Sequence, residues 1–181
     1  MITLALDTST TFLAIAALRN GKPVFAIADD IGRQHGELLL PTLQRNLAQH
    51  NVEPSDITRI ITGIGPGSYT GVKIALATAK GIAAGSDAEL FGYTSLAGLL
   101  PSVTPDVPLT LLVDAGRGRF YAQRFHRSDE GITVLSEPWR IAADEAPPAG
   151  ELVYWDASMG VRAAQLAQVR GVTSRIFPYY L

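Results

Sequence analysis

Residues 63–71, GIGPGSYTG, are the stretch whose composition most suggests chemistry. Four glycines and three hydroxyl side chains lie between a run that reads as a strand and one that reads as a helix. Free backbone N–H groups at the start of a helix can bind an anion, so this loop could hold a phosphate. Alternatively, the glycines only let the backbone turn sharply and approach a sheet closely.

The loop departs from the known phosphate-binding patterns. Lys73 follows Gly71 one position too late for a Walker loop. The dinucleotide fingerprint lacks its third glycine, and Ser68 is not centred between glycines as a nucleophile elbow requires. These departures favour the turn interpretation. The residues that remain candidates for contact with an anion or a nucleotide are Gly65, Gly67, Ser68 and Asp7.

Asp7 is the second place where chemistry could occur, because it ends a strand-like run and precedes four hydroxyl residues, 8–11. A carboxylate in such a corner can hold magnesium and phosphate in phosphotransfer folds. An Asx-type turn, in which Asp7 accepts hydrogen bonds from nearby N–H groups, is the favoured interpretation. No glycine is present where a phosphate would need to approach the backbone closely.

The histidines do not suggest a metal centre. His35, His50 and His126 include no pair with the i, i+4 spacing of a helix-borne zinc site. We therefore predict no metal site. The spacing suggests no Ser/His/Asp set either, so no catalytic residue is assigned. His35, in RQHGE, is interpreted either as a contact at a subunit or ligand edge or as a solvated residue at a helix start.

Arginines lie beside aromatic residues in the segment 114–125, DAGRGRFYAQRF. Arg117, Arg119 and Arg124 could therefore contact RNA, but a strand with alternating exposed and buried positions is the favoured interpretation. Residues 1–100 hold 7 basic and 8 acidic residues, and the net charge of the chain is −2. Neither half thus has the basic surface of a protein that binds nucleic acid alone.

The hydrophobic pattern predicts an α/β fold with an internal duplication. Asn20-Gly21 predicts a tight hairpin turn, and Asp114 takes the place of Asp7 when the pattern restarts. Strands are expected at 2–7, 12–18, 22–28, 58–64, 89–93, 109–115, 119–126 and 131–137, and helices at 37–50, 71–85 and 158–169. A joint at 102–108 separates an expected lobe at 1–103 from a smaller one at 104–181.

The first two predicted helices have different patterns. In 37–50, Leu39, Leu43 and Leu47 form a stripe that Leu40 widens, and Pro41 requires a helix start near residue 37 or later. The helix 71–85, closed by its last glycine, is apolar almost all round and rich in alanine. We expect it to be covered on two sides, by the sheet and by the other helix, or to be an ordinary core helix.

Length and composition limit the class of protein. The 181 residues are 47% hydrophobic and 18% charged, enough for a globular core of one large domain or two small lobes. No apolar run is long enough for a membrane span, and the N-terminal residues read as a core strand, so no membrane association is expected. The absence of cysteine excludes disulfides and thiolate metal sites and suggests a cytoplasmic setting.

Several of these segments together resemble one family. LALDTST at the start, RQH, GIGPGSYTGVKIALATAKGIA, VDAGRGRFY and PYYL at the end follow each other in the chain. They resemble the TsaB (YeaZ-type) subunits of the bacterial machinery that makes threonylcarbamoyladenosine (t6A) on tRNA. The resemblance covers most of residues 1–125 and the last few residues, and GPGSYTG with its helix is the most specific part. Residues 137–177 look short for the family.

The resemblance implies an actin-like, sugar-kinase-like (ASKHA) fold of two RNase H-like lobes, the second one reduced. It implies a non-catalytic subunit that pairs with the catalytic subunit TsaD through two helices, is joined by the ATPase TsaE, forms a homodimer when alone, and meets tRNA indirectly. ATP and metal are expected in the partner subunits. An ATP-binding phosphotransferase is the alternative, and a protease is ranked last. The interface candidates are Arg33, Gln34, His35, Leu39, Leu43, Leu47, Tyr69, Thr70, Lys73, Ile74, Ala77, Lys80 and Gly81.

Overall fold

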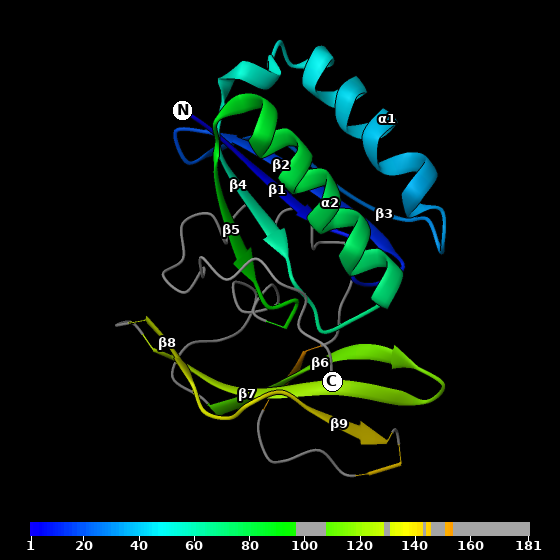
Figure 1. Cartoon of the computed structure of the whole chain (residues 1–181). Coiled ribbons are helices and arrows are strands. Elements are labelled where there is room, and N and C mark those ends of the chain that lie inside the picture. Colours follow the sequence, from blue (N-terminus) through cyan, green and yellow to red (C-terminus); the bar gives the residue numbers. More distant parts are fainter. Residues whose placement is uncertain (97–107, 129–130, 143, 146–150, 154–181) are drawn as a thin grey trace.

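Two β-sheets and two helices make up the described part of the chain (Figure 1). The computed structural model describes residues 1–96, 108–128, 131–142, 144–145 and 151–153. The predicted lobe boundary at 103/104 and the predicted helix 158–169 lie outside these residues, so both remain predictions. Neither described helix is long and apolar enough to cross a membrane.

The first sheet has the strand order β3-β2-β1-β4-β5. Its strands are β1 (Ile2–Asp7), β2 (Phe12–Arg19), β3 (Lys22–Asp30), β4 (Ile57–Gly63) and β5 (Glu89–Tyr93), close to the predicted ranges. Asn20 and Gly21 turn the chain between β2 and β3 with φ angles of 51° and 80°, which confirms the predicted hairpin turn. β4 and β5 run parallel to β1, so these three strands end at the same edge of the sheet.

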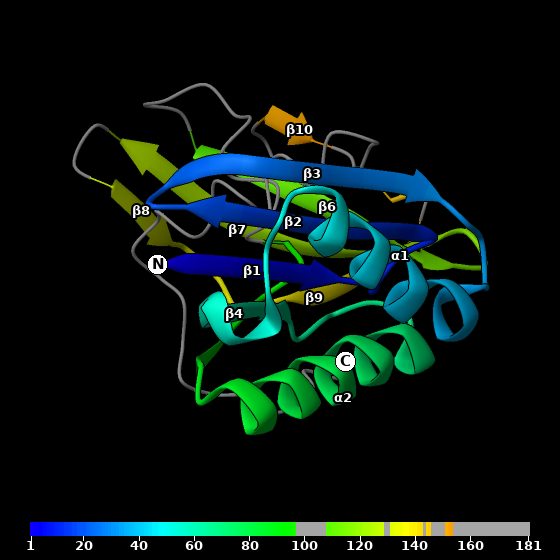
Figure 2. The same ribbon diagram turned by 90° about the horizontal axis from the view of Figure 1, so that it is seen from above.

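Helices α1 (His35–Gln49) and α2 (Tyr69–Ser86) lie side by side on one face of the first sheet, and the short 3-10 helix η1 (Pro54–Asp56) precedes β4 (Figures 1 and 2). Their apolar side chains bury the core: Leu39, Leu43 and Leu47 pack with Ile15 and Ile60 of the sheet. Burial of each such side chain contributes roughly 1.5–3 kcal/mol to folding.

Both helices differ from the prediction at one end. Helix α1 begins at His35, so Pro41 lies inside it and not in its first turn. Pro41 is exposed, and because it has no N–H, the carbonyl of Glu37 lacks its usual helical hydrogen bond. In α2, Gly85 is an ordinary helical residue, and the residue with left-handed conformation that ends the helix is Asp87, with φ 53°.

The second sheet repeats the start of the first. Its strands are β6 (Pro108–Gly116), β7 (Arg119–Ser128), β8 (Gly131–Val134), β9 (Trp139–Ala142) and β10 (Glu151–Val153). Like β1, β6 pairs antiparallel with the next strand and parallel with a later one, as the predicted duplication requires. The predicted strand 131–137 is too long, since β8 ends three residues earlier, ahead of Pro138, and β9 was not predicted.

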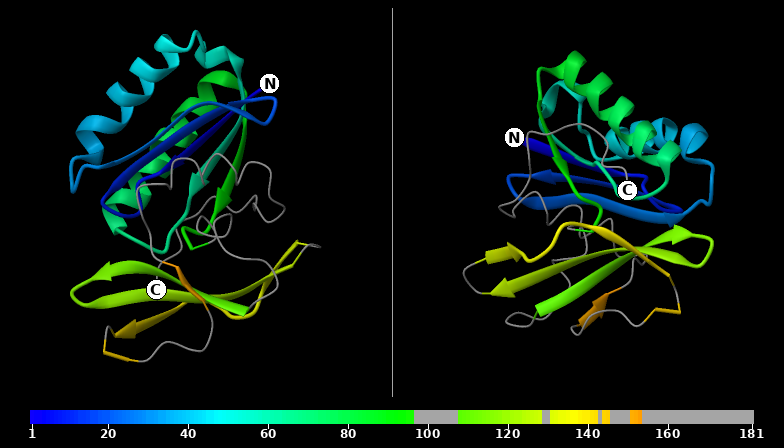
Figure 3. Two further views of the ribbon diagram at one scale, coloured as in Figure 1. Left: turned by 180° about the vertical axis from the view of Figure 1, so that it is seen from behind. Right: turned by 60° about the horizontal axis from the view of Figure 1, so that its bottom comes forward.

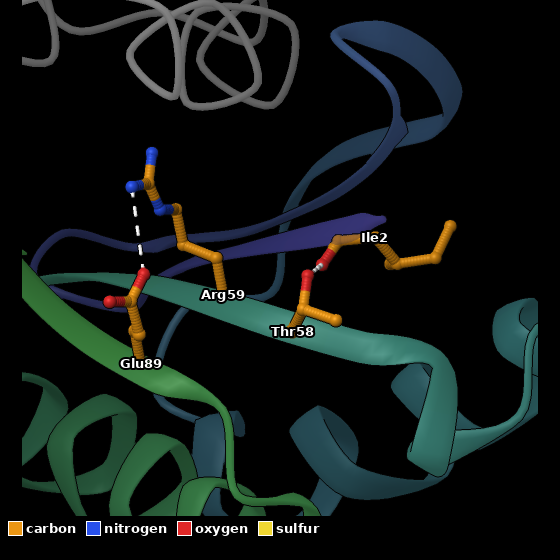
Figure 4. A network of polar contacts seen from close by, with 4 residues as sticks. All are labelled: Ile2, Thr58, Arg59 and Glu89. Atoms are coloured by element: carbon orange, nitrogen blue, oxygen red, sulfur yellow. Dashed lines mark hydrogen bonds and ion pairs between the residues drawn. The ribbon is translucent and has the colours of Figure 1, made fainter.

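The layers follow one another as helices, first sheet and second sheet (Figures 2 and 3). Ion pairing contributes little at the first sheet's surface. Arg59 on β4 lies 3.7 Å from the Glu89 carboxylate on β5 and 4.8 Å from the ring of Phe91, while the Thr58 hydroxyl donates to the Ile2 carbonyl (Figure 4). Glu89 is largely exposed, so the ion pair contributes about 0–1 kcal/mol.

Candidate functional site

The glycine loop and the Asp7 turn meet where β1, β4 and β5 end. In an α/β sheet, the carboxyl ends of parallel strands are the usual place for a ligand. Asp7 ends β1, Gly63 ends β4, and Tyr93 ends β5 directly opposite Gly63 in the register. The two segments that the sequence marked for chemistry are therefore neighbours in space.

The Asp7 carboxyl is buried, with 1% of its surface exposed. Its Oδ1 accepts a hydrogen bond of 2.7 Å from the N–H of Ser9, which confirms the Asx-type turn. Burial raises the pKa of the Asp7 carboxyl above its ordinary value. The hydrogen bonding with Ser9 and the proximity of the Tyr93 hydroxyl and the His35 ring act in the opposite direction. The environment therefore favours the neutral acid more than water does.

Tyr93 is a functional candidate that the sequence analysis missed. Its hydroxyl lies beside Asp7, and burial, together with the Asp7 charge, raises the pKa of Tyr93 well above its usual range. The hydroxyl is nevertheless not in bonding geometry, since it and Asp7 Oδ2 have no hydrogen-bond partner within the described residues. Ser9 Oγ and Ser95 Oγ are also buried and also have no hydrogen-bond partner within the described residues. The sequence signal that could have identified Tyr93 is its position at the end of the predicted strand 89–93, which runs parallel to β1 as β5.

Three glycines allow the two segments to touch. A β carbon at Gly67 would lie 2.3 Å from the carbonyl oxygen of Ser9, and one at Gly71 would lie 1.9 Å from that of Thr8. At Gly63 it would meet the Asp7 carboxylate at 2.3 Å. No real side chain tolerates such contacts, so these positions require glycine. This confirms the interpretation that the glycines allow the backbone to approach the sheet closely.

Hydrogen bonds hold the start of α2 against the Asp7 turn. The N–H of Ser68 donates to the Ser9 carbonyl at 2.6 Å, and the Thr8 hydroxyl donates to the Gly71 carbonyl at 2.7 Å. Ser68 caps the helix, because its Oγ accepts from the N–H of Gly71 at 3.2 Å. The Ser68 and Gly71 N–H groups are thus already used inside the protein.

These contacts limit the predicted anion site. Asp7 and Gly65 are buried, Gly67 is half-buried, and of the four candidates only Ser68 is exposed. A phosphate next to Asp7 would require the turn and the loop to separate, so the arrangement does not favour the phosphotransferase alternative. Contact with an anion at the exposed helix start stays a prediction.

Part of the predicted interface lies in the core. Leu39, Leu43 and Leu47 are 1%, 2% and 6% exposed, because they face the sheet. His35 is 5% exposed and its Nε2 lies 3.1 Å from the Phe12 carbonyl oxygen, so it is neither solvated nor at an edge. These four side chains therefore face the protein's own core in the free chain, and their role at an interface stays a prediction. Ile74 is half-buried against the same core.

The other interface candidates are exposed. Arg33 and Gln34 precede α1, and one face of α2 presents Tyr69, Thr70, Lys73, Ala77, Lys80 and Gly81. Lys73 donates a hydrogen bond to the Tyr69 hydroxyl, one helical turn earlier, and its ammonium lies 3.9 Å from that ring's centroid. We call this side of α2 the small-residue face. Its role in an interface stays a prediction.

Helix α1 adds exposed apolar side chains that the prediction omitted. Leu40 is 51% exposed, although the sequence analysis counted it with the stripe of Leu39, Leu43 and Leu47. It follows Leu39 by one residue, which rotates it by about 100° around the helix away from the core. Pro41 is exposed beside it. Gly36 faces α2: a β carbon there would lie 3.8 Å from Ile74 Cδ1, so the helices pack closely near their starts.

No group of three or more His, Cys, Asp or Glu side chains that could hold a metal ion occurs among the described residues. The part of the chain outside the described ranges is not covered by this statement. The predicted lack of a metal site and of a catalytic residue therefore stays a prediction.

Comparison with known proteins adds a family match. The model of the family "TsaD: tRNA N6-adenosine threonylcarbamoyltransferase" matches residues 28–170. The protein "tRNA threonylcarbamoyladenosine biosynthesis protein TsaB" of Escherichia coli (strain K12) is 29% identical over 154 residues, across 83% of this chain and 64% of that protein. Its namesake from Bacillus subtilis (strain 168) is 32% identical over 122 residues, across 67% and 53%. The chain thus spans between about half and two thirds of these relatives' length.

The fold has a close match among solved structures. YeaZ from Pseudomonas aeruginosa superimposes with a TM-score of 0.76 at 24% identity, and the match covers 99% of each chain. Together with the family match, this confirms the predicted actin-like, sugar-kinase-like fold.

Proposed function

Because the chain belongs to the tRNA N6-adenosine threonylcarbamoyltransferase (TsaD) family and is of the TsaB (YeaZ) type, we propose that it is a non-catalytic subunit for t6A formation on tRNA. In this proposal it docks onto a TsaD-type catalytic subunit, which carries out the transfer to adenosine. The small-residue face of α2, together with exposed Leu40 on the neighbouring helix α1, is the observation that carries the proposal.

The shape of this face suits another protein chain. Ala77 and Gly81, one turn apart on α2, are exposed and short, so a partner's backbone can come close. Leu40 and Tyr69 expose 51% and 59% of their surface, and burying such side chains favours association. Lys73 and Lys80 add positive charge to this face, which suits acidic groups of a partner. A helix pair of this kind fits the helix-mediated pairing that the TsaB resemblance implies.

The closed Asp7 turn supports a non-catalytic role. The corner where a phosphotransferase of this fold would bind nucleotide is filled by the protein's own hydrogen bonds. The further parts of the proposal come from the resemblance: TsaE as a third subunit, a homodimer when the chain is alone, ATP and metal in the partner subunits, and a cytoplasmic location.

Co-purification with a TsaD-type subunit tests the proposal. We expect the full chain and TsaD to elute together in size-exclusion chromatography, and Ala77→Glu to weaken the complex by at least about tenfold, because it buries an unpaired charge. Ala77 is exposed, so the variant should keep the fold of the free chain. Ala26→Glu, on exposed edge strand β3, is the matched control and should bind normally. Failure of the wild-type chain to form a complex would refute the proposal.

A further inference from the structure

The tip of the β6–β7 hairpin holds an arginine in an unfavourable backbone conformation. Arg117 and Gly118 form the turn with φ angles of 57° and 68°. Asn20 and Gly21 form the β2–β3 turn with nearly the same angles, 51° and 80°. Asparagine tolerates this left-handed region well, whereas a long side chain seldom occupies it. Backbone preference therefore does not account for the arginine, which directs attention to its side chain.

Two more arginines extend outward from this tip. Arg119 begins β7 and is exposed, like Arg117, and neither forms an ion pair within the described ranges. Arg140 on β9 stands opposite Tyr121 in the register, with its guanidinium 5.7 Å from the ring centroid. Arg119 and Tyr121 are two residues apart on β7, so their side chains lie on one face of the sheet. Arg140, which stands opposite Tyr121, lies on that face as well. We call Arg117, Arg119 and Arg140 the arginine tip.

Three exposed carboxylates, Glu137, Asp144 and Glu145, lie near the arginine tip, and none forms an ion pair with Arg117 or Arg119 among the described residues. Asp144 and Glu145 follow Ala142, the register partner of Arg119, and the Oε2 of Glu145 accepts a 2.8 Å hydrogen bond from the Ala142 N–H. Asp144 and Glu137 are exposed beyond the two ends of β9. The chain as a whole carries a net charge of −2, so three arginines at one end of a sheet are a local feature and not a general basic surface.

We propose that the arginine tip binds the phosphate backbone of RNA. The inference rests on the proposed function, in which tRNA is the RNA that the complex acts on. It adds a direct contact between this chain and tRNA to the indirect contact expected from the sequence. Guanidinium groups bind phosphate oxygens in a bidentate manner, and three of them on a rigid turn and its adjoining strands can follow a backbone. The contact is auxiliary, since three arginines neutralise only a few phosphates.

The arrangement supplies a variant that separates charge from folding. Arg117→Asn copies the Asn20-Gly21 turn of the same chain, so the thermal midpoint should stay equal or rise. The measurement is the fluorescence anisotropy of fluorescein-labelled bulk tRNA titrated with the full chain. At roughly 0.15 M salt, the affinity should fall by about fivefold for each phosphate that the protein no longer neutralises. The slope of log affinity against log salt should fall by about 0.7–0.9. Arg119→Gln should behave in the same way.

Arg19→Gln is the matched control, because Arg19 is exposed and precedes the Asn20-Gly21 turn. It should leave tRNA binding nearly unchanged. The proposal is overturned if the wild-type chain does not bind tRNA, if Arg117→Asn binds as well as wild type, or if Arg19→Gln weakens binding equally. Competition by polyglutamate as effective as by unlabelled tRNA would point to an acidic protein and also overturn it. Because tRNA binding is measured on the chain alone, its failure is distinct from failure to pair with TsaD.

Discussion

Asp7 and Gly63 share one small space from two neighbouring strands. A β carbon on Gly63 would lie 2.3 Å from Asp7 Oδ2 and 2.5 Å from its Cγ. The glycine at the end of β4 therefore leaves room for the carboxyl that ends β1. The buried Tyr93 hydroxyl from β5 lies on the same side, so three parallel strands meet at one polar cluster.

Gly63→Ala should destabilise the protein by about 2–3 kcal/mol, because the new methyl group displaces the Asp7 carboxyl in a closely packed site. Gly85→Ala is the matched control. Position 85 lies in helix α2 with nothing within 4 Å of an added β carbon. Alanine there should stabilise the helix by about 0.5–1 kcal/mol. Chemical denaturation of both variants measures the two effects, and equal stabilities would contradict the packing argument.

Asp7→Asn should change how stability depends on pH. Burial raises the folded-state pKa of Asp7 above the value of 3.8 that applies when the chain is unfolded. The stabilising contribution of the protonated acid is therefore fully present below the unfolded pKa and is lost as pH rises through the folded pKa. Asparagine does not ionise, so the variant's stability minus that of wild type should increase from acid toward neutral pH.

The measurement for Asp7 is the free energy of unfolding of both proteins at several pH values. Subtracting the two curves removes contributions of carboxyl groups that do not interact with Asp7. Tyr93 and His35 face Asp7, so their interaction with its charge is the part that the subtraction does not remove. A difference that is flat, or that decreases toward neutral pH, would show that the Asp7 carboxyl is not held in a site that favours its neutral form.

The sequence was sufficient for most of the first lobe. Period-2 and period-3.6 patterns locate β1 to β5 and both helices within a few residues, since each element buries a regular apolar face. The Asn20-Gly21 turn and the Asx turn at Asp7 were predicted because their residue types have local conformational preferences. Fold class and duplication followed from the order of these elements.

The parts that sequence could not predict depend on contacts between distant segments. Tyr93 belongs with Asp7 only because β5 pairs beside β4, which no local pattern shows. Leu39, Leu43 and Leu47 were placed on a partner surface, although a buried helix face and an interface helix face have the same composition. Leu40 was counted with the same stripe because helix patterns do not fix how wide such a stripe is.

Pro41→Ala tests the cost of a proline inside helix α1. The helix begins at His35, so Pro41 lies beyond the first turn, where it has no N–H to offer to the Glu37 carbonyl. Alanine restores this hydrogen bond and the helix propensity, worth about 3 kcal/mol, but gives the unfolded chain about 0.4–1 kcal/mol of additional entropy. The variant should thus be about 2 kcal/mol more stable in denaturant unfolding.

Pro23→Ala, on exposed β3, is the control, because it supplies only the entropic effect and should be slightly destabilising. If Pro41→Ala gains nothing, helix α1 already accommodates the proline without loss. If the stabilised variant also binds TsaD less well than wild type, the proline-containing face of α1 takes part in the interface.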